Sequence, residues 1–219
     1  MGNTIKKNQL YGVHVINLDT KKDRFDYIDN VLEQGGMDYK RVSAVNGKQF
    51  DTVPKITASQ GYPDLECLGN IKRNENLAHT GCYMSHLKCI KMIAEGQDNF
   101  GLILEDDAKF IVPDFKRVID EIISDNLGID IIWFNAPSET EVIQKYEMPT
   151  WGTQGYMLSK RGAKLLYNVL KPGSEWIHRK EECLFDLILP IAVRDTKMKW
   201  KVFSLITQNK NFTSSISNS

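Results

Sequence analysis

Three adjacent carboxylates, at positions 105–107, are the residues of this chain best suited to chemistry. They follow Phe100–Leu104, an apolar run of the kind that forms an interior strand. Open α/β sheets bind ligands at the carboxyl ends of their strands, so we expect Glu105, Asp106 and Asp107 to lie at a binding site. Adjacent carboxylates repel one another, and a hard cation such as Mg²⁺ or Mn²⁺ removes that repulsion. The alternative interpretation is a solvated acidic turn after a strand.

Composition limits the size of the protein and the class of its partners. The 219 residues, 42% of them hydrophobic, can bury one sizeable core. Lys+Arg and Asp+Glu are both 28, so the net charge is zero and gives no general reason to expect a nucleic-acid or anionic-membrane surface. A local basic groove is compatible with this balance and would suit a nucleotide diphosphate. We therefore predict no nucleic-acid partner.

The sequence carries no recognisable targeting or membrane-spanning segment. Residues 1–9 are polar, unlike a signal peptide, and apolar stretches such as 184–193 are too short to span a bilayer. The four cysteines show no Cys-x-x-Cys spacing, which argues against a zinc or redox motif. We expect a reducing, cytoplasmic location, which includes the periphery of a membrane, and no transmembrane segment.

Hydrophobic periodicity predicts an α/β protein of one domain, 1–219, with a mixed, mainly parallel sheet flanked by helices. A strand at 13–18 precedes a helix that Thr20 would cap and Gly35-Gly36 would end. Further strands are expected at 39–45, 100–105, 129–135, 155–158 and 202–206, and further helices from Thr80 to 95, from Pro113, from a Ser159 cap to 170, and from Cys183 to a break or kink at Pro190. Residues 48–78 are predicted to be a long loop excursion, and 214–219 a flexible tail.

Several blocks in a fixed order carry a family resemblance. The blocks are Val15-Ile-Asn-Leu-Asp19 with Asp23-Arg24, Ser43-Ala-Val-Asn-Gly47, Gly81-Cys-Tyr-Met-Ser-His-Leu87, Leu102-Ile-Leu-Glu-Asp-Asp107, Thr153-Gln-Gly-Tyr-Met-Leu-Ser159 with Gly162-Ala163, and Ser214-Ser-Ile216. Each block is weak alone, but their ordered combination resembles glycosyltransferase family 25. That family contains lipopolysaccharide-biosynthesis and collagen galactosyltransferases.

The resemblance implies a GT-A-like fold, a nucleotide-sugar donor and a metal motif of the Asp-x-Asp type. It places Glu105 and Asp107 as ligands of Mn²⁺ or Mg²⁺, with Asp107 binding directly. Glu105 or Asp106 would act through water or through the donor's ribose, and which of the two does so stays open. No late histidine completes the metal shell, so the donor's phosphates and waters would supply the remaining ligands.

The same resemblance, together with local chemistry, gives a set of donor-binding candidates. They are Asn17, Leu18, Arg24, Asn46, Gly47, Ser85, His86, Asp106, Thr153, Gln154 and Tyr156. Each has a structural alternative: Arg24 as a helix residue paired with an Asp, Asn46-Gly47 as a simple turn, and His86 as a hydrogen-bonded core histidine. The block from Thr153 to Tyr156 would line the donor-sugar or acceptor pocket.

The family is understood to invert the anomeric centre, which requires a general base. Asp186, a lone carboxylate in an apolar stretch, is the candidate, since burial would raise its pKa; a structural salt bridge or cap is its alternative role. The expected function is transfer of a hexose, galactose, from a UDP-sugar to a hydroxyl of a glycan, a lipid-linked glycan or a hydroxylated peptide. An inactive GT-A-fold scaffold is the alternative; a sugar nucleotidyltransferase fits less well, because residues 17–24 contain no glycine.

Overall fold

The structure, a computed structural model, describes residues 10–62, 77–135, 152–178 and 184–212. Its main sheet contains β1 (Gly12–Asn17), β2 (Lys40–Ser43), β3 (Phe100–Glu105), β5 (Ile131–Trp133), β6 (Gly155–Ser159) and β7 (Trp200–Val202). A separate pair consists of β4 (Ala108–Phe110) and β8 (Ile206–Gln208). The helices are α1 (Lys22–Gln34), α2 (Val53–Ser59), α3 (Leu77–Glu95), α4 (Phe115–Asp125), α6 (Lys160–Leu170), α7 (Glu175–His178), α8 (Phe185–Asp195) and the short 3-10 helix η1 (Gly47–Gln49).

The six-stranded sheet has the order β2-β1-β3-β6-β5-β7. β1 runs parallel to β2 and β3, and β5 runs parallel to β7, while β6 is antiparallel to both of its neighbours, β3 and β5. The predicted α/β architecture with a mixed, mainly parallel sheet is therefore confirmed. The carboxyl ends of β1 and β3 lie side by side, because Ile16 pairs with Glu105.

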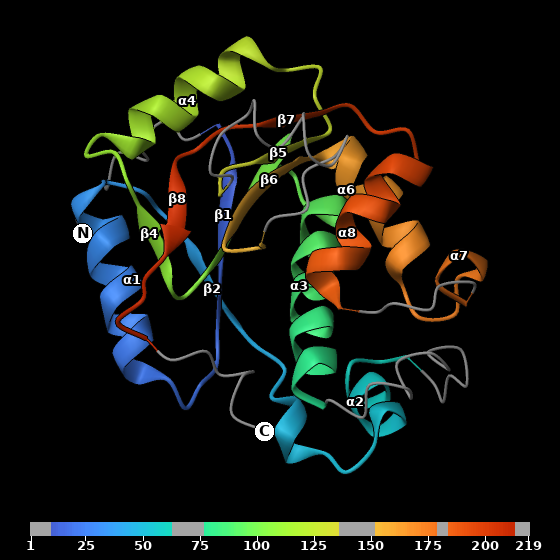
Figure 1. The fold of residues 1–219 in the computed structure, drawn as a ribbon. Helices are drawn as coiled ribbons and strands as arrows, with labels where there is room; N and C mark the ends of the chain where they lie inside the picture. Colours follow the sequence, from blue (N-terminus) through green and yellow to red (C-terminus); the bar gives the residue numbers. More distant parts are fainter. Residues whose placement is uncertain (1–9, 63–76, 136–151, 179–183, 213–219) are drawn as a thin grey trace, which may run out of the picture.

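Helices cover both faces of this sheet, and the alternation of side chains along β3 shows which helices share a layer. Leu102 and Leu104 are buried with α1 and α4, whereas Ile103 is buried with α3, α6 and α8. Figure 1 shows the two groups of helices on opposite sides of the strands. A strand buried on both faces needs apolar residues throughout, which explains the uninterrupted run before the carboxylates.

Helix ends follow local chemistry at some positions and tertiary structure at others. The Ser159 hydroxyl accepts a hydrogen bond from the Gly162 amide, so the predicted cap of α6 is confirmed. α1 ends before Gly35-Gly36 as predicted, and Gly36 adopts a left-handed φ of 62°. The predicted Thr20 cap is wrong: Lys21 holds the cap position of α1, and no side chain caps that end.

The 48–78 excursion is not wholly a loop. It contains η1 and the helix α2, and α3 begins at Leu77, earlier than Thr80. α2 buries Val53 and Ile56 beside α3, and this packing stabilises a helix too short to show periodicity. Residues 63–76 of the excursion, and the predicted tail 214–219, lie outside the described residues.

Two further elements near the C-terminus differ from expectation. α8 continues beyond Pro190 to Asp195, although the proline lies in the helix interior, where it removes a backbone donor; Pro190 is itself buried in the core, and this packing stabilises the helix. The strand expected at 202–206 is divided: β7 joins the main sheet beside β5, and β8 leaves it to pair with β4. Within the described ranges, no helix is long and apolar enough to cross a membrane.

Gly81 provides a test of how closely α3 approaches the turn that follows β2. A Cβ atom at Gly81 would lie 2.4 Å from the Val45 carbonyl oxygen and 2.6 Å from the Gly47 amide nitrogen. We expect Gly81→Ala to lower the free energy of unfolding by about 1–3 kcal/mol, because backbone must move to admit the methyl group. Urea unfolding measures the change.

Gly128→Ala is the matched control, because its Cβ would meet no heavy atom within 4 Å. We expect that variant to be as stable as the parent or slightly more stable. Equal stability of both variants would contradict the close approach at Gly81.

Candidate active site

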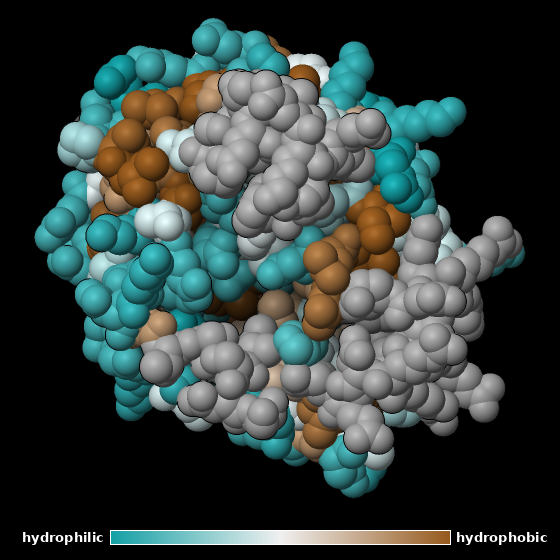
Figure 2. Space-filling view, viewed as in Figure 1, coloured by the Kyte–Doolittle hydropathy of each residue, from teal (hydrophilic) through white to brown (hydrophobic). Residues whose placement is uncertain are grey.

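A cleft of about 330 Å³ opens at the carboxyl ends of β1 and β3. Figure 2 shows a recess on this face of the molecule. The cleft is lined by the end of β1, the start of α1, the 44–48 turn, the inner face of α3 and the first two carboxylates. Its lining residues are Ile16, Asn17, Leu18, Thr20, Lys21, Arg24, Ala44, Val45, Asn46, Gly47, Lys48, Ala78, Cys82, Ser85, His86, Glu105 and Asp106.

The 44–48 turn is held against α3 by hydrogen bonds rather than by chance contact. The Ser85 hydroxyl donates to the Gly81 carbonyl oxygen at 2.7 Å and accepts from the Val45 amide at 2.8 Å. The Asn46 side chain accepts from the Lys48 amide and so caps η1. Ser85 and Asn46 therefore shape one wall of the cleft, in addition to lining it.

A buried guanidinium lies between two of the three carboxylates. Arg24 Nη1 donates to Asp106 Oδ1 at 2.7 Å, and Nη2 donates to Asp107 Oδ2 at 2.9 Å. All three side chains are less than a tenth exposed. Asn17 adds a 2.7 Å hydrogen bond to Asp106, and Gln208 of β8 adds one of 3.0 Å to Asp107. The structure thus uses Arg24, assigned to the donor in the sequence analysis, to neutralise the acidic turn.

Burial and the neighbouring Arg24 have opposite effects on the pKa values of these two carboxyl groups. Burial raises the pKa of Asp106 to about 6, although Arg24 and Asn17 both favour its charged form. Burial and the charge of Glu105 likewise raise the pKa of Asp107. A single guanidinium therefore only partly compensates the cost of burying two carboxylates.

The two predicted metal ligands, Glu105 and Asp107, differ in how they face the cleft. Glu105 and Asp106 line the cleft, but Asp107 does not, because its Oδ2 atom faces Arg24 and Gln208 and its Oδ1 atom is buried. Across the described residues, no group of three or more His, Cys, Asp or Glu side chains is placed to hold a metal ion. Asp107 Oδ1 has no hydrogen-bond partner among the described residues, so direct ligation by Asp107 stays a prediction.

Glu105 is connected to the predicted base through a single hydroxyl group. Thr153 Oγ1 lies 2.6 Å from Glu105 Oε1 and 2.8 Å from Asp186 Oδ1. A threonine hydroxyl has one hydrogen, so it donates to one carboxylate, and the second contact requires a proton on the other carboxyl group. One hydrogen-bond network therefore joins Glu105 of β3, Thr153 before β6 and Asp186 of α8.

The opposite pKa shifts of Glu105 and Asp186 indicate which of the two carboxyl groups holds that proton. Burial opposes ionisation of Glu105, but the nearby His86 and the Thr153 hydroxyl outweigh it and hold the pKa of Glu105 below its usual value. Desolvation and the negative charge of Glu105 raise the pKa of Asp186. Although Asp186 as a residue is exposed on α8, its carboxyl group turns toward Thr153. Asp186 is thus the group that takes up a proton first.

His86 supports Glu105 from within the core. Its ring is stacked on Phe185 of α8 with centroids 4.3 Å apart, and Nε2 lies 3.4 Å from Glu105 Oε1. Its Nδ1 atom lies 3.1 Å from the Tyr156 hydroxyl, and Tyr156 is fully buried. The structure therefore places Tyr156 behind His86, where it positions the imidazole and cannot contact a donor directly.

The cleft brings together most, though not all, of the predicted site residues. Asn17, Leu18, Arg24, Asn46, Gly47, Ser85, His86, Glu105 and Asp106 line it, whereas Asp107, Thr153, Gln154, Tyr156 and Asp186 do not. Thr153 and Asp186 are connected to it through Glu105. The Gln154 side chain accepts from Asn135, and its carbonyl accepts from the Glu105 amide, so it supports the strand end.

Sequence reasoning missed two basic residues of the cleft, Lys21 and Lys48. Lys21 lies at the uncapped N-terminal end of α1, where amide groups are available to an anion. The signal was present in the sequence, since only residues 18–20 separate Lys21 and Lys22 from the end of the first strand. The element boundaries that bring Lys21 rather than Lys22 to the cleft could not be predicted from it.

Comparison with known proteins identifies the family of this chain. Residues 11–148 match the family model described as glycosyltransferase family 25 (LPS biosynthesis protein), which is more than half of the chain. The chain belongs to glycosyltransferase family 25. The matched range includes the acidic turn and all the lining residues of the cleft, but ends before Thr153 and Asp186.

Curated relatives of this family member include a glycosyltransferase 25 family member of Aedes aegypti. It is 31% identical over 174 residues, which cover 70% of this chain and 27% of that protein. Procollagen galactosyltransferase 1-B of Xenopus laevis is 30% identical over 177 residues, which cover 71% of this chain and 28% of that protein. The aligned region thus spans little more than a quarter of these relatives' length.

Among solved structures, a glycosyltransferase involved in glycosylation of the major capsid of PBCV-1 is similar to this chain. Its TM-score is 0.49 at 9% sequence identity, over 90% of this chain and 83% of that one. At this distance the similarity adds nothing to the argument from the cleft.

The buried ion pairs predict a large stability effect at Arg24. Arg24→Met leaves Asp106 and Asp107 buried without a cation and should cost about 3–5 kcal/mol in urea unfolding. Because the folded-state pKa of Asp106 is raised to about 6, protonation favours the fold below that pH, and this contribution is lost as pH rises. The loss in the variant should therefore be larger near pH 8 than near pH 5, measured on both proteins.

Arg117→Met is the matched control. Arg117 forms two ion pairs with Asp114 and Glu121 on the exposed surface of α4, and such pairs contribute at most about 1 kcal/mol. If Arg24→Met cost no more than this control, the acidic turn would not depend on the guanidinium.

Proposed function

We propose that this chain is a hexosyltransferase that moves galactose from UDP-galactose to a hydroxyl group of an acceptor, with inversion. The acceptor is a glycan, a lipid-linked glycan or a hydroxylated peptide. The observation that carries the proposal is the cleft itself. In this family 25 protein, the cleft contains Glu105, which is linked through Thr153 to Asp186, the candidate proton acceptor. It also contains basic groups, Lys21 and Lys48, that suit a diphosphate.

The shape of the surface supports an extended nucleotide donor. A second cavity of about 250 Å³ shares Leu18, Thr20 and residues 44–46 with the cleft, and is also lined by Gln49, Phe50 and Gln60. An aromatic ring and amide side chains suit a planar nucleobase with donor and acceptor groups. In this proposal the base occupies the second cavity and the hexose lies near Glu105.

The basic end of the cleft would stabilise the leaving group. Transfer of the sugar leaves negative charge on the departing nucleoside diphosphate, and fixed positive groups stabilise that charge as it develops. Lys21, Lys48 and the free amides of the first turn of α1 are the candidates for this role. The expected cation, Mn²⁺ or Mg²⁺, is supported by the family resemblance alone.

Asp186 would take the proton of the acceptor hydroxyl. Its raised pKa makes it a stronger base than an ordinary carboxylate, and Thr153 fixes the orientation of its carboxyl group. The lower pKa of Glu105 keeps a negative charge near the reacting sugar, where positive character develops at the anomeric carbon. The proposal gives these two carboxyl groups separate roles, which their different environments support.

UDP should bind and stabilise the folded protein. We expect its melting temperature to rise on addition of UDP, and to rise less with CDP, GDP or ADP, because a ligand of the native state stabilises it by mass action. Lys21→Ala should weaken UDP binding about tenfold, the effect of losing one charged hydrogen bond. The measurement is made with and without Mn²⁺, so that it also tests the cation.

The neighbouring lysine gives the control for this experiment. Lys22 is exposed and does not line the cleft, so Lys22→Ala should bind UDP as the parent does. If no nucleotide changed the melting temperature under either condition, the chain would be a non-catalytic scaffold of this fold.

Asp186→Asn should lower turnover by about 10²–10⁴-fold with little change in UDP affinity, since only the proton transfer is lost. In the parent, activity should rise with pH through the raised pKa of Asp186, because the base acts only when ionised. Hydrolysis and transfer by a panel of UDP-hexoses, measured across pH, test both statements.

Asp195→Asn, at the other end of α8, is the control and should leave the pH profile unchanged. A collapse of UDP binding in Asp186→Asn would instead assign Asp186 to the donor site.

A further inference from the structure

The outer surface of α3 and α6 concentrates positive charge. The two helices pack against each other in antiparallel orientation: the Tyr83 hydroxyl near the start of α3 donates to the Leu170 carbonyl at the end of α6, and the Lys160 amide donates to Asn99, just after α3. We define the basic face as five lysines: Lys88 and Lys91 of α3, Lys160 and Lys164 of α6, and Lys171 at its C-terminal cap. None of them lines the cleft.

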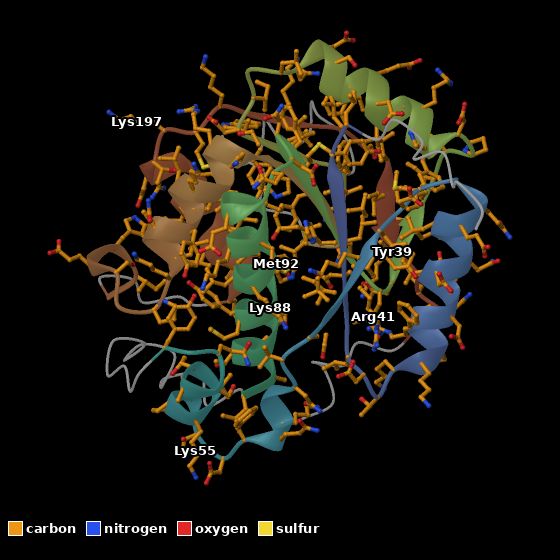
Figure 3. The ribbon with its side chains drawn as sticks, turned by 180° about the vertical axis from the view of Figure 1, so that it is seen from behind. Tyr39, Arg41, Lys55, Lys88, Met92 and Lys197 are labelled. Carbon is orange, nitrogen blue, oxygen red and sulfur yellow. The ribbon has the colours of Figure 1, made fainter. Side chains whose placement is uncertain are left out.

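Helical spacing brings these lysines to one side. Lys160, Lys164, Tyr167 and Lys171 follow at intervals of four, three and four residues, which places them along one stripe of α6. The ammonium groups of Lys91 and Lys171 lie 5.9 and 6.0 Å from the centre of the Tyr167 ring. The stripes of the two helices therefore meet at Tyr167. Figure 3 shows Lys88 and Met92 along α3, seen from behind the molecule.

The charge of this face is not balanced within its own helices. Glu95 is the one acidic residue in α3, and α6 contains none, although the whole chain has zero net charge. Lysines spaced at i and i+4 repel one another and weaken a helix. Arg161 of α6 is paired with the buried Asp130, so it serves the fold instead. Lys88 donates to the Ser43 carbonyl oxygen of β2 at 3.2 Å, so it also serves the fold. The other four lysines have a cost that packing of the core does not explain.

We propose that the basic face binds the surface of a bilayer that contains anionic phospholipids. Lysine provides a compact charge on a flexible stem, which suits a diffuse negative surface better than the planar, bidentate recognition that arginine provides. Such stems can lie along apolar headgroup regions while their ammonium groups stay hydrated. Tyr167, at the centre of the face, is of a residue type enriched at membrane–water interfaces, and its hydroxyl lies 3.0 Å from that of Tyr62.

This inference is independent of the proposed catalytic activity, because the basic face and the cleft share no residue. It predicts that the protein lies on the bilayer without inserting a helix, in accord with the helices of the described part of the chain. Binding should weaken with salt, since exposed charges are screened.

Co-sedimentation with vesicles tests the proposal. The parent should bind vesicles of phosphatidylcholine mixed with phosphatidylglycerol, should not bind phosphatidylcholine alone, and should be released by high salt. The double variant Lys91→Glu, Lys164→Glu should bind at least about thirty-fold more weakly. A second pair, Lys88→Glu with Lys164→Glu, leaves the Lys91 contact with Tyr167 intact and should give the same loss.

The control carries the same charge change elsewhere: Lys109→Glu with Lys201→Glu, two exposed lysines of β4 and β7. This control should keep most of the binding, and melting temperatures establish that all variants are folded. Equal loss in the control, or no binding by the parent, would overturn the proposal. Binding to heparin or single-stranded RNA in the absence of vesicle binding would overturn it in favour of a soluble polyanion.

Discussion

The arrangement of this protein depends on one buried cation between two buried carboxylates. The guanidinium of Arg24 has its donors fixed in a plane, and it uses two of them on Asp106 and Asp107. This contact determines where the first helix lies relative to the end of β3. As a consequence, the uncapped end of α1, with Lys21, is held at the cleft. Binding geometry and fold stability are therefore linked through the same side chain.

The three adjacent carboxylates, which look equivalent in the sequence, have different environments. Asp106 and Asp107 are buried against Arg24, and Asp107 is also attached to β8 through Gln208. Glu105 is a quarter exposed, ends the strand, and contacts Thr153 and His86. Glu105 is the last residue of β3, whereas Asp106 and Asp107 lie in the turn that follows it, and this change of backbone direction separates their side chains from that of Glu105. A charged run of this kind can therefore divide into a structural part and a chemical part.

The sequence was sufficient where the signal is local or repeats along the chain. The apolar run before Glu105, the Ser159 cap and the Gly35-Gly36 stop all follow from short-range chemistry, and the ordered blocks located most of the cleft. The sequence was insufficient where contacts between residues far apart along the chain determine the local structure. Arg24 had no visible partner in the sequence, because Asp106 and Asp107 lie more than eighty positions away. In the same way, burial of Tyr156 behind His86, the passage of α8 through Pro190 and the division of β7 from β8 result from tertiary packing.

The pairing of β4 with β8 has a consequence for biosynthesis. The Asn209 amide donates to the Asp107 carbonyl, and Gln208 donates to the Asp107 carboxylate, so the acidic turn is completed by residues about a hundred positions downstream. While the ribosome is still making the intervening helices, that turn lacks its last partners. Contacts so far apart along a chain form slowly, and the nascent protein exposes the unpaired strand until they do. The acidic turn is therefore among the last parts of this molecule to gain all its contacts.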